Sequence, residues 1–201
     1  MKKRKARIHR RTNETDITVL LTIDGRGFSK IDTGIGFLDH MLTLFAKHGI
    51  FDLEIMAKGD LKVDLHHTNE DVGICLGQAF KKALGQKKGI RRFGYASIPM
   101  DDAWVEVAVD IGGRPVLSEY KDASSKINKP QTPDAYTFYD VKEFLRAFVN
   151  NLGFNLAFSI KLGDDLHHVV EAMFKALALA LDQATQIDQR IKGIPSTKGR
   201  L

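Results

Sequence analysis

Two segments of the sequence carry the same set of metal-binding residue types. "DLHHTNED" at residues 64–71 and "DLHHVVEA" at residues 165–172 each contain two adjacent histidines and a glutamate three residues after the second histidine. Corresponding residues of the two segments lie 101 positions apart. A single His-His-x-x-Glu match is a weak signal. The same pattern at a constant separation indicates a duplicated site with one chemical purpose.

The spacing within each segment suits the ligands of two metal ions. On a helix that begins near the second histidine, the first histidine and the glutamate are four residues apart and share a face. The adjacent histidines point about 100° apart, so one ion cannot easily take both from one helix. Each pair would instead offer one histidine to each of two ions. Imidazole with carboxylate suits Mn, Fe, Co, Ni or Zn better than Ca or Mg. His40, in "GIGFLDHM", is an additional candidate ligand.

The positive charge of the chain suggests an anionic partner. The net charge is +5 and the pI is about 9.2. Nucleic acid and phosphorylated small molecules both fit such a balance. The sequence contains no zinc-finger, RNP-like or basic heptad pattern, so a small molecule is favoured over nucleic acid. Candidate anion-binding residues are Arg92, Arg114, Lys175 and the segment "PSTKG" with Ser196, Thr197 and Lys198.

Composition indicates a globular cytoplasmic protein. The chain has 201 residues, of which 43% are hydrophobic, enough to bury a core. No apolar run approaches the roughly 20 residues of a membrane span, and no signal peptide is expected. The single cysteine, Cys75, cannot form an internal disulfide and is expected to be a small core residue. We therefore expect no membrane association.

Hydrophobic periodicity predicts a duplicated order of elements. Alternation predicts strands within residues 16–24, 51–59, 104–113 and 155–163, and helical spacing predicts helices within 37–49, 72–84, 141–153 and 169–181. The order helix, strand, turn and His-His helix thus occurs twice. It predicts two half-repeats, residues 1–93 and 94–201. The polar segment 118–138 is expected to be a surface loop.

Longer motifs resemble one enzyme family almost from end to end. They include "TGIGFLDHML", "DLHHTNEDVGICLG", "GIRRFG", "PMDDA", "GGRP", "DLHHVVEAMFKALA" and "PSTKG", and they resemble the imidazoleglycerol-phosphate dehydratases of histidine biosynthesis. The resemblance implies an α+β fold of two duplicated ferredoxin-like βαβ half-domains, with helices packed on one face of mixed sheets. It also implies a hydro-lyase with two Mn²⁺ ions per active site, shared between subunits of a 24-subunit shell.

The resemblance also assigns roles to individual residues. It places the metal ligands at His40, His66, His67, Glu70, His167, His168 and Glu171. It places the phosphate-binding residues at Arg92, Arg114, Lys175, Ser196 and Lys198. Glu14, in "NETD", is implied to contact the substrate. Glu171 and Glu14 are the candidates for proton transfer, and the sequence leaves open which is the base and which the acid.

One position departs from the family pattern in a way that bears on the metal. The family's usual Leu-His-Ile supplies an eighth ligand, but "LAFSI" places Ala157 there, on the face of the strand opposite Leu156 and Phe158. A lesser departure is Leu44, where many relatives have glutamine. Two alternatives stay open. One is a dinuclear metallohydrolase acting on a phosphorylated small molecule, and the other is a metal-binding shell protein whose activity is weak because of Ala157.

Overall fold

The order of elements repeats along the chain. The computed structural model describes residues 3–121, 127 and 135–201. The first half contains β1 (Lys5–Arg11), β2 (Thr15–Thr22), β3 (Ser29–Asp32), α1 (Gly36–His48), β4 (Asp52–Gly59) and α2 (His66–Leu84). The second half contains β5 (Phe93–Met100), β6 (Ala103–Asp110), β7 (Val116–Lys121), α3 (Phe138–Leu152), β8 (Asn155–Leu162) and α4 (Leu166–Thr185). The expected boundary between residues 93 and 94 falls at the start of β5 and stays a prediction.

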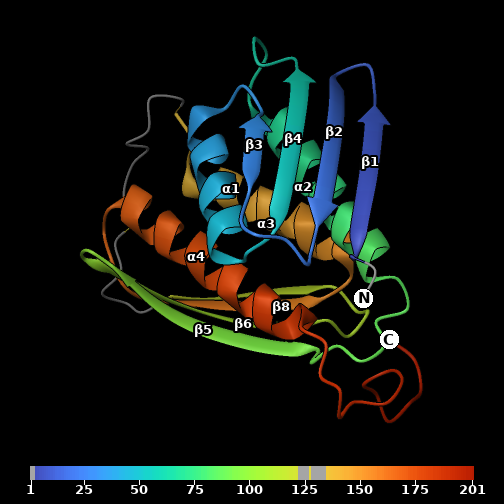
Figure 1. The fold of residues 1–201 in the computed structure, drawn as a ribbon. Coiled ribbons are helices and arrows are strands. Elements are labelled where there is room, and N and C mark those ends of the chain that lie inside the picture. The colour runs from blue at the N-terminus through green and yellow to red at the C-terminus, as the bar shows by residue number, and fades with distance from the viewer. Residues whose placement is uncertain (1–2, 122–126, 128–134) are drawn as a thin grey trace.

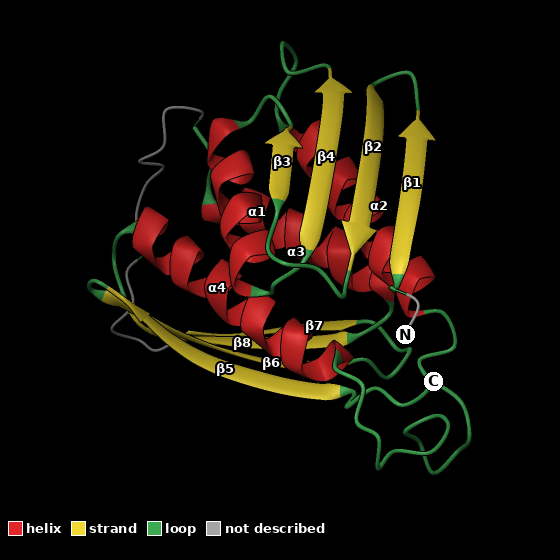
Figure 2. Cartoon of the chain, viewed as in Figure 1, coloured by secondary structure: helices red, strands yellow, loops and turns green. Residues whose placement is uncertain are grey.

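The two halves form two mixed sheets with all four helices between them (Figures 1 and 2). One sheet has the order β1-β2-β4-β3 and the other the order β5-β6-β8-β7. In each sheet the last strand pairs in parallel and the others pair antiparallel. Helix α2 packs on the first sheet and α4 on the second, while α1 contacts α4 and α2 contacts α3. The fold is therefore α+β, with helices covering one face of each sheet.

Alternation along the central strands places one face of each sheet in the core. In β2, Ile17, Val19 and Leu21 are buried. In β8, Leu156 and Phe158 are likewise buried, and the residue between them is exposed. This period of two is the pattern that the sequence predicted, and burial of these side chains is the main force that holds the sheets against the helices.

Each histidine-bearing helix begins at an aspartate that accepts backbone hydrogen bonds. The backbone N–H of His66 donates to Asp64 Oδ1 at 2.8 Å. In the second half, Asp165 Oδ1 accepts from the N–H groups of His167 at 2.7 Å and His168 at 3.1 Å. Aspartate at a helix start satisfies donors that have no partner within the helix. The repeated "Asp-Leu-His-His" is therefore a helix start that fixes where the histidines emerge.

Glycines let the strand before each of these helices approach closely. A Cβ at Gly59 would overlap the Thr68 side chain of α2. At the corresponding place in the second half, Gly163 has a φ of +126°, and a Cβ there would lie 2.5 Å from a methyl group of Val169. Only glycine tolerates both the φ value and the contact. The two glycines thus allow each strand end to pack on the first turns of its histidine helix.

The prediction of a surface loop over residues 118–138 was wrong at both ends. Ser118 to Lys121 belong to β7, which pairs in parallel with β8, and Phe138 begins α3. Polar composition suggested a loop, but pairing with a buried neighbour overrides strand propensity at a sheet edge. Residues 122–126 and 128–134 lie outside the described part of the chain.

The strands β1, β3 and β5 were not predicted from periodicity. Strand β1 reads "KARIHRR" and is largely exposed, and β3 has only four residues. Both are edge strands, where charged residues are common and apolar alternation is weak. Strand β5 is also an edge strand with a mostly exposed pattern.

The described residues contain no helix that is long and apolar enough to cross a membrane. Cys75 is buried on α2, as predicted. Burial raises the pKa of its thiol to about 12. The thiol is therefore protonated at neutral pH and behaves as a small apolar group.

Candidate active site

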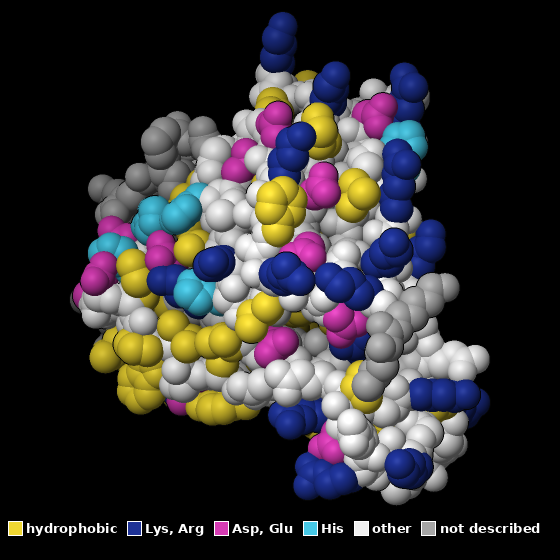
Figure 3. Space-filling view, in the orientation of Figure 1, with side chains coloured by type: hydrophobic (Ala, Val, Ile, Leu, Met, Phe, Trp, Pro, Cys, Tyr) yellow, Lys and Arg dark blue, Asp and Glu magenta, His cyan; other side chains and the backbone are white. Residues whose placement is uncertain are grey.

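The second histidine motif meets a third ligand from the first half of the chain. His40 on α1 and His167 and Glu171 on α4 place one nitrogen or oxygen atom each within 4.8 Å of the other two. Glu171 Oε2 lies 3.4 Å from His40 Nε2 and 3.2 Å from His167 Nε2. Figure 3 shows histidine side chains gathered on this side of the molecule, with acidic and basic side chains among them.

Glu171 is held as a carboxylate by its surroundings. Its side chain is only 9% exposed, and its second oxygen, Oε1, lies 2.6 Å from Lys175 Nζ. Burial by itself would raise the Glu171 pKa, but Lys175, His40 and His167 together outweigh burial, so the pKa lies below its ordinary value. One oxygen therefore faces a cation and the other faces two imidazoles, which is a suitable arrangement for a metal ligand or a base.

The glutamate of the first histidine motif is more exposed than that of the second. His66 Nε2 lies 3.7 Å from Glu70 Oε2, and the Glu70 side chain is 46% exposed. The His66 ring stacks near Tyr139, with 6.5 Å between ring centroids. Within each motif the adjacent histidines diverge as expected, with ring centroids 6.1 Å apart in both pairs. Among the described residues, Glu70 and this pair do not form a three-ligand group of their own.

The second histidine of each pair is bound to an aspartate through Nδ1. His67 Nδ1 lies 3.0 Å from Asp60 Oδ2, and His168 Nδ1 lies 2.6 Å from Asp102 Oδ1. These contacts raise the pKa of both histidines, against an opposing effect of burial. Metal-binding histidines commonly donate their other ring N–H to a carboxylate. The Asp60 contact leaves His67 Nε2 for an ion, whereas His168 Nε2 lies 3.4 Å from Asp101 Oδ2.

The donor set fits a transition metal. Two imidazole nitrogens and a carboxylate oxygen are ligands that Mn, Fe, Co, Ni and Zn share, whereas Ca and Mg prefer oxygen alone. Ligand atoms about 2.1 Å from one ion lie roughly 3–3.5 Å apart, and the two contacts of Glu171 Oε2 fall in that range. The cluster of His40, His167 and Glu171 therefore has ligand types and spacings close to those of such a site.

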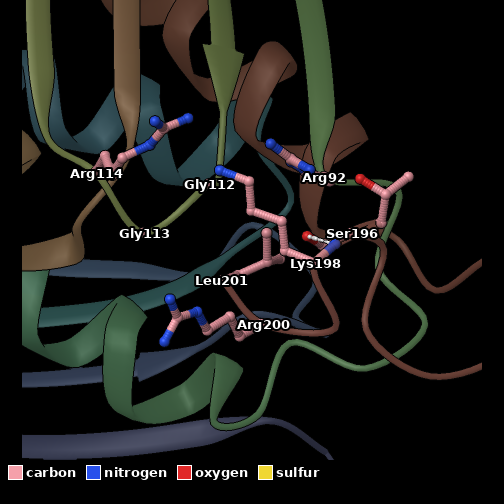
Figure 4. A pocket seen from close by; sticks show the side chains of 9 residues that line it. Arg92, Gly112, Gly113, Arg114, Ser196, Lys198, Arg200 and Leu201 are labelled. Atoms are coloured by element: carbon pink, nitrogen blue, oxygen red, sulfur yellow. Dashed lines mark hydrogen bonds between the residues drawn. The ribbon is translucent and has the colours of Figure 1, made fainter.

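A separate pocket of about 330 Å³ gathers the predicted anion-binding residues (Figure 4). Its lining residues come from three segments: residue 92 before β5, residues 112–114 between β6 and β7, and residues 196–198, 200 and 201 near the C-terminus. The cationic lining residues are Arg92, Arg114, Lys198 and Arg200, with Ser196 and Thr197 beside them. Such a concentration of donors suits a phosphate group.

The Arg92 side chain lines this pocket and is held by three hydrogen bonds. Its Nε donates to Asp110 Oδ1 at 2.6 Å, Nη2 donates to Asp110 Oδ2 at 2.9 Å, and Nη1 donates to the Pro195 carbonyl at 3.0 Å. The hydrogen bonds to Asp110 raise the pKa of the guanidinium further above its ordinary value. Arg92 also ties the C-terminal segment to β6. The pocket is thereby organised before any ligand arrives.

The pocket and the His40 cluster lie near opposite ends of α4. The Arg92 N–H donates to the Ala184 carbonyl near the helix C-terminus, while His167 is in the first turn. These two helix positions are 17 residues apart, which at 1.5 Å per residue is about 25 Å. Lys175, a predicted phosphate-binding residue, lies between them on α4, with its Nζ 2.6 Å from Glu171 Oε1.

Two further sequence expectations can be placed. Ala157 lies on the outer face of β8, between Ala108 and Ser118 of the neighbouring strands, and away from the helices. Glu14 lies in the β1–β2 turn, 4.0 Å from His67 Nδ1. A histidine outside both motifs, His48, ends α1, and burial and the nearby Lys175 lower its pKa.

Sequence reasoning missed the acidic partners of the site. Asp60 and Asp102 bind the histidines, and Asp110 binds Arg92. A signal existed, because Asp102 lies in "PMDDA" and Asp110 just before "GGRP", two of the motifs that carry the family resemblance. The pattern did not show which histidine or arginine each acid would contact, because those contacts join residues of separate elements and turns that only the tertiary fold brings together.

Comparisons with known proteins agree over nearly the whole chain. The family model described as imidazoleglycerol-phosphate dehydratase matches residues 33–181. The chain is 55% identical to the imidazoleglycerol-phosphate dehydratase of Geobacter metallireducens, covering 98% of the chain and 99% of that relative. It is 56% identical to that of Thermoanaerobacter pseudethanolicus, covering 98% and 100%.

Solved structures give the same result. The crystal structure of imidazoleglycerol-phosphate dehydratase from Staphylococcus aureus matches with a TM-score of 0.80 at 35% identity, covering 92% of this chain and 99% of that one. The enzyme from Pyrococcus furiosus matches with a TM-score of 0.79 at 36% identity, covering 96% and 100%. Sequence and fold together show that the chain belongs to the imidazoleglycerol-phosphate dehydratases, hydro-lyases of histidine biosynthesis.

Proposed function

We propose that the chain dehydrates D-erythro-imidazole glycerol phosphate to imidazole acetol phosphate and depends on two Mn²⁺ ions per active site. The observation that carries the proposal is the three-ligand cluster of His40, His167 and Glu171 in a chain that also has a cationic pocket. An imidazole substrate with a phosphate tail needs both kinds of site. Family membership supports this pairing of sites with this substrate.

The metal would be held by two sets of ligands. His40, His167 and Glu171 would form one set together with one histidine of the first pair, and the other set would draw on the other histidine of that pair, Glu70 and His168. Ions bound there would supply Lewis-acid stabilisation of negative charge on the imidazole ring. The Asp60 and Asp102 contacts to Nδ1 favour the tautomers that leave Nε2 as the ligand atom.

The carboxylates would move the protons. The carbon next to the imidazole ring loses its hydroxyl, and the neighbouring carbon loses its hydrogen as a proton to a base. The leaving hydroxyl takes a proton from an acid and departs as water, and the enol that remains becomes the ketone by moving its hydroxyl proton to carbon. Glu171 is ionised and buried, and Glu14 is exposed at 55% beside His67. These are the two candidates for base and acid.

A complete site would need more than one copy of the chain. A three-carbon phosphate ester on an imidazole ring is about 10 Å long at roughly 1.5 Å per bond. The cationic pocket and the His40 cluster are about 25 Å apart along α4. One substrate therefore cannot bridge them within a single chain, but it can bridge the pocket of one copy and the cluster of another. This favours a homo-oligomer, and we propose the 24-subunit shell that the family resemblance implies.

The test is the product formed from imidazole glycerol phosphate, measured by mass spectrometry with Mn²⁺ and with a chelator. The proposal predicts a product lighter by the mass of one water, formed only with metal. Release of phosphate would identify a metallohydrolase instead. A metal-loaded protein that leaves the substrate unchanged would indicate a shell protein impaired at Ala157.

Metal removal should also alter the assembly, because ligands from different copies would share ions. We expect a chelator to lower the thermal transition and reduce particle size measured by light scattering. Unchanged size and unchanged transition would reject metal sites shared between subunits.

A further inference from the structure

The two aspartates that bind the second histidine of each pair come from different places in the repeat. Asp60 directly follows β4, whereas Asp102 lies in the turn between β5 and β6. The residues at the corresponding places in the opposite halves are also acidic. The β1–β2 turn carries Glu14, and Asp164 follows β8 after Gly163. Each half therefore has an acid at both places, but a different one binds the histidine.

The distances show how the halves differ. In the first half, Asp60 Oδ2 is 3.0 Å from His67 Nδ1, and the turn residue Glu14 is 4.0 Å from the same atom. In the second half, the turn residue Asp102 is itself the Nδ1 partner at 2.6 Å. The side chain of Glu14 is 55% exposed, that of Asp60 28%. Asp60, which follows β4, thus binds His67 Nδ1, and Glu14, in the turn, remains exposed to solvent.

This difference matters because a histidine ligand needs only one acidic partner. A carboxylate on Nδ1 fixes the tautomer and the ring orientation and leaves Nε2 for a metal. Once Asp60 fills that position at His67, a second carboxylate close by has no structural task there.

We infer that Asp60 and Asp102 are positioning residues for His67 and His168, and that Asp60 frees Glu14 to contact the substrate. The statement about Glu14 rests on the proposed function. The statement about the two aspartates does not, because it concerns metal binding alone.

The first experiment titrates the full-length protein with Mn²⁺ alone and measures free Mn²⁺ by electron paramagnetic resonance. Asp60→Ala and Asp102→Ala should each weaken one class of site by about 10–100-fold. Asp60→Asn and Asp102→Asn should recover part of that loss, because the amide oxygen still accepts the ring N–H. A matched control is Asp16→Ala, since Asp16 Oδ1 lies 2.8 Å from His9 Nε2 outside both motifs. Equal affinities in Asp60→Ala, Asp102→Ala and Asp16→Ala would overturn the inference.

The second experiment asks whether Asp60 frees Glu14. In the otherwise native chain, Glu14→Gln should leave Mn²⁺ affinity within about twofold, because Asp60 already partners His67. In the Asp60→Ala background, Glu14 is the nearest remaining carboxylate and should partly replace Asp60, so adding Glu14→Gln should weaken binding by at least a further fivefold or so. The same small effect in both backgrounds would overturn this part. Because the readout is metal binding, an inactive enzyme would reject the proposed function and leave the aspartate assignments standing.

Discussion

The histidine motif of α4 and that of α2 have the same residue types at the same spacing but different surroundings. Glu171 is 9% exposed and is bound by Lys175, whereas Glu70 is 46% exposed. The residue of α2 that corresponds to Lys175 is Ile74. A cation one turn after the glutamate therefore occurs in only one of the two motifs. Duplication preserved the ligands and changed the electrostatics around them.

The third ligand shows the same asymmetry. Helix α1 packs against α4 and brings His40 to Glu171. Helix α2 packs against α3, where the residue corresponding to His40, counted back from the terminal glycine, is the buried Phe144. The second motif thus receives a ligand from the first half, and the first motif receives none from α3. This comparison suggests that the α2 motif is completed by another copy of the chain.

The largest difference between the motifs should appear when each glutamate is neutralised. Glu171→Gln removes a buried carboxylate that we propose moves a proton, and should lower kcat by roughly 10²–10⁴-fold even at saturating Mn²⁺. Glu70→Gln should chiefly raise the Mn²⁺ needed for half-maximal rate, by about tenfold or more. Steady-state rates over a Mn²⁺ titration distinguish these outcomes. Equal loss of kcat in both variants would show that Glu171 and Glu70 have the same role in catalysis.

A smaller effect is expected from removing single cations, either from the pocket that contains Arg92 and Arg114 or from Lys175 on α4. Arg114→Ala should raise KM by about 10–150-fold, which corresponds to a charge-assisted contact of roughly 1.5–3 kcal/mol. Arg92→Ala should raise KM similarly, and should also loosen the C-terminal segment that it ties to Asp110. Lys175→Ala should raise KM too if the lysine reaches the phosphate. Michaelis–Menten analysis of the three variants tests this, and an unchanged KM in Arg114→Ala would remove the pocket from the substrate site.

Lys175 should also change the pH dependence. Lys175 is among the groups that hold the Glu171 pKa below its ordinary value, so removing it should raise that pKa. With Glu171 as the proposed base or metal ligand, the active form is the carboxylate, which is lost as pH falls through the Glu171 pKa. The acidic limb of the kcat profile should therefore move to higher pH in Lys175→Ala. An unmoved limb, with Arg114→Ala as the control, would contradict the electrostatic difference between the motifs.

The repeated elements of the two halves could be predicted from the sequence, but the edge strands and the surroundings of the two glutamates could not. The duplicated helices, the central strands and the divergence of the paired histidines follow from local periodicity. The edge strands β1, β3, β5 and β7 do not, because pairing with their buried neighbours determines whether they form. The environments of Glu70 and Glu171 depend on which helix packs beside each. That is a property of the tertiary fold, and single-sequence patterns do not encode it.

The smallest expected effect concerns the outer face of the second sheet. Ala157 is exposed there, beside Glu106, Ser118 and Tyr95 in a pocket of about 240 Å³. A histidine at this position points away from the chain's own cluster and can only join an ion held by another copy. Ala157→His should then lower the Mn²⁺ midpoint of activity about tenfold, with less effect at saturating Mn²⁺. If the native chain and Ala157→His have the same Mn²⁺ midpoint of activity, residue 157 does not contact a metal ion.

The account depends most directly on an active site shared between copies of the chain. Its sharpest test is co-expression of two impaired variants, His167→Ala, which lacks the metal cluster, and Arg114→Ala, which lacks a pocket cation, assayed at a substrate concentration far below the KM of Arg114→Ala. In hybrid particles some sites would combine an intact cluster from one variant with an intact pocket from the other. We predict dehydratase activity well above that of either variant alone or of the two mixed after separate purification. Hybrid particles no more active than their parents would contradict the shared site and place the whole reaction within one chain.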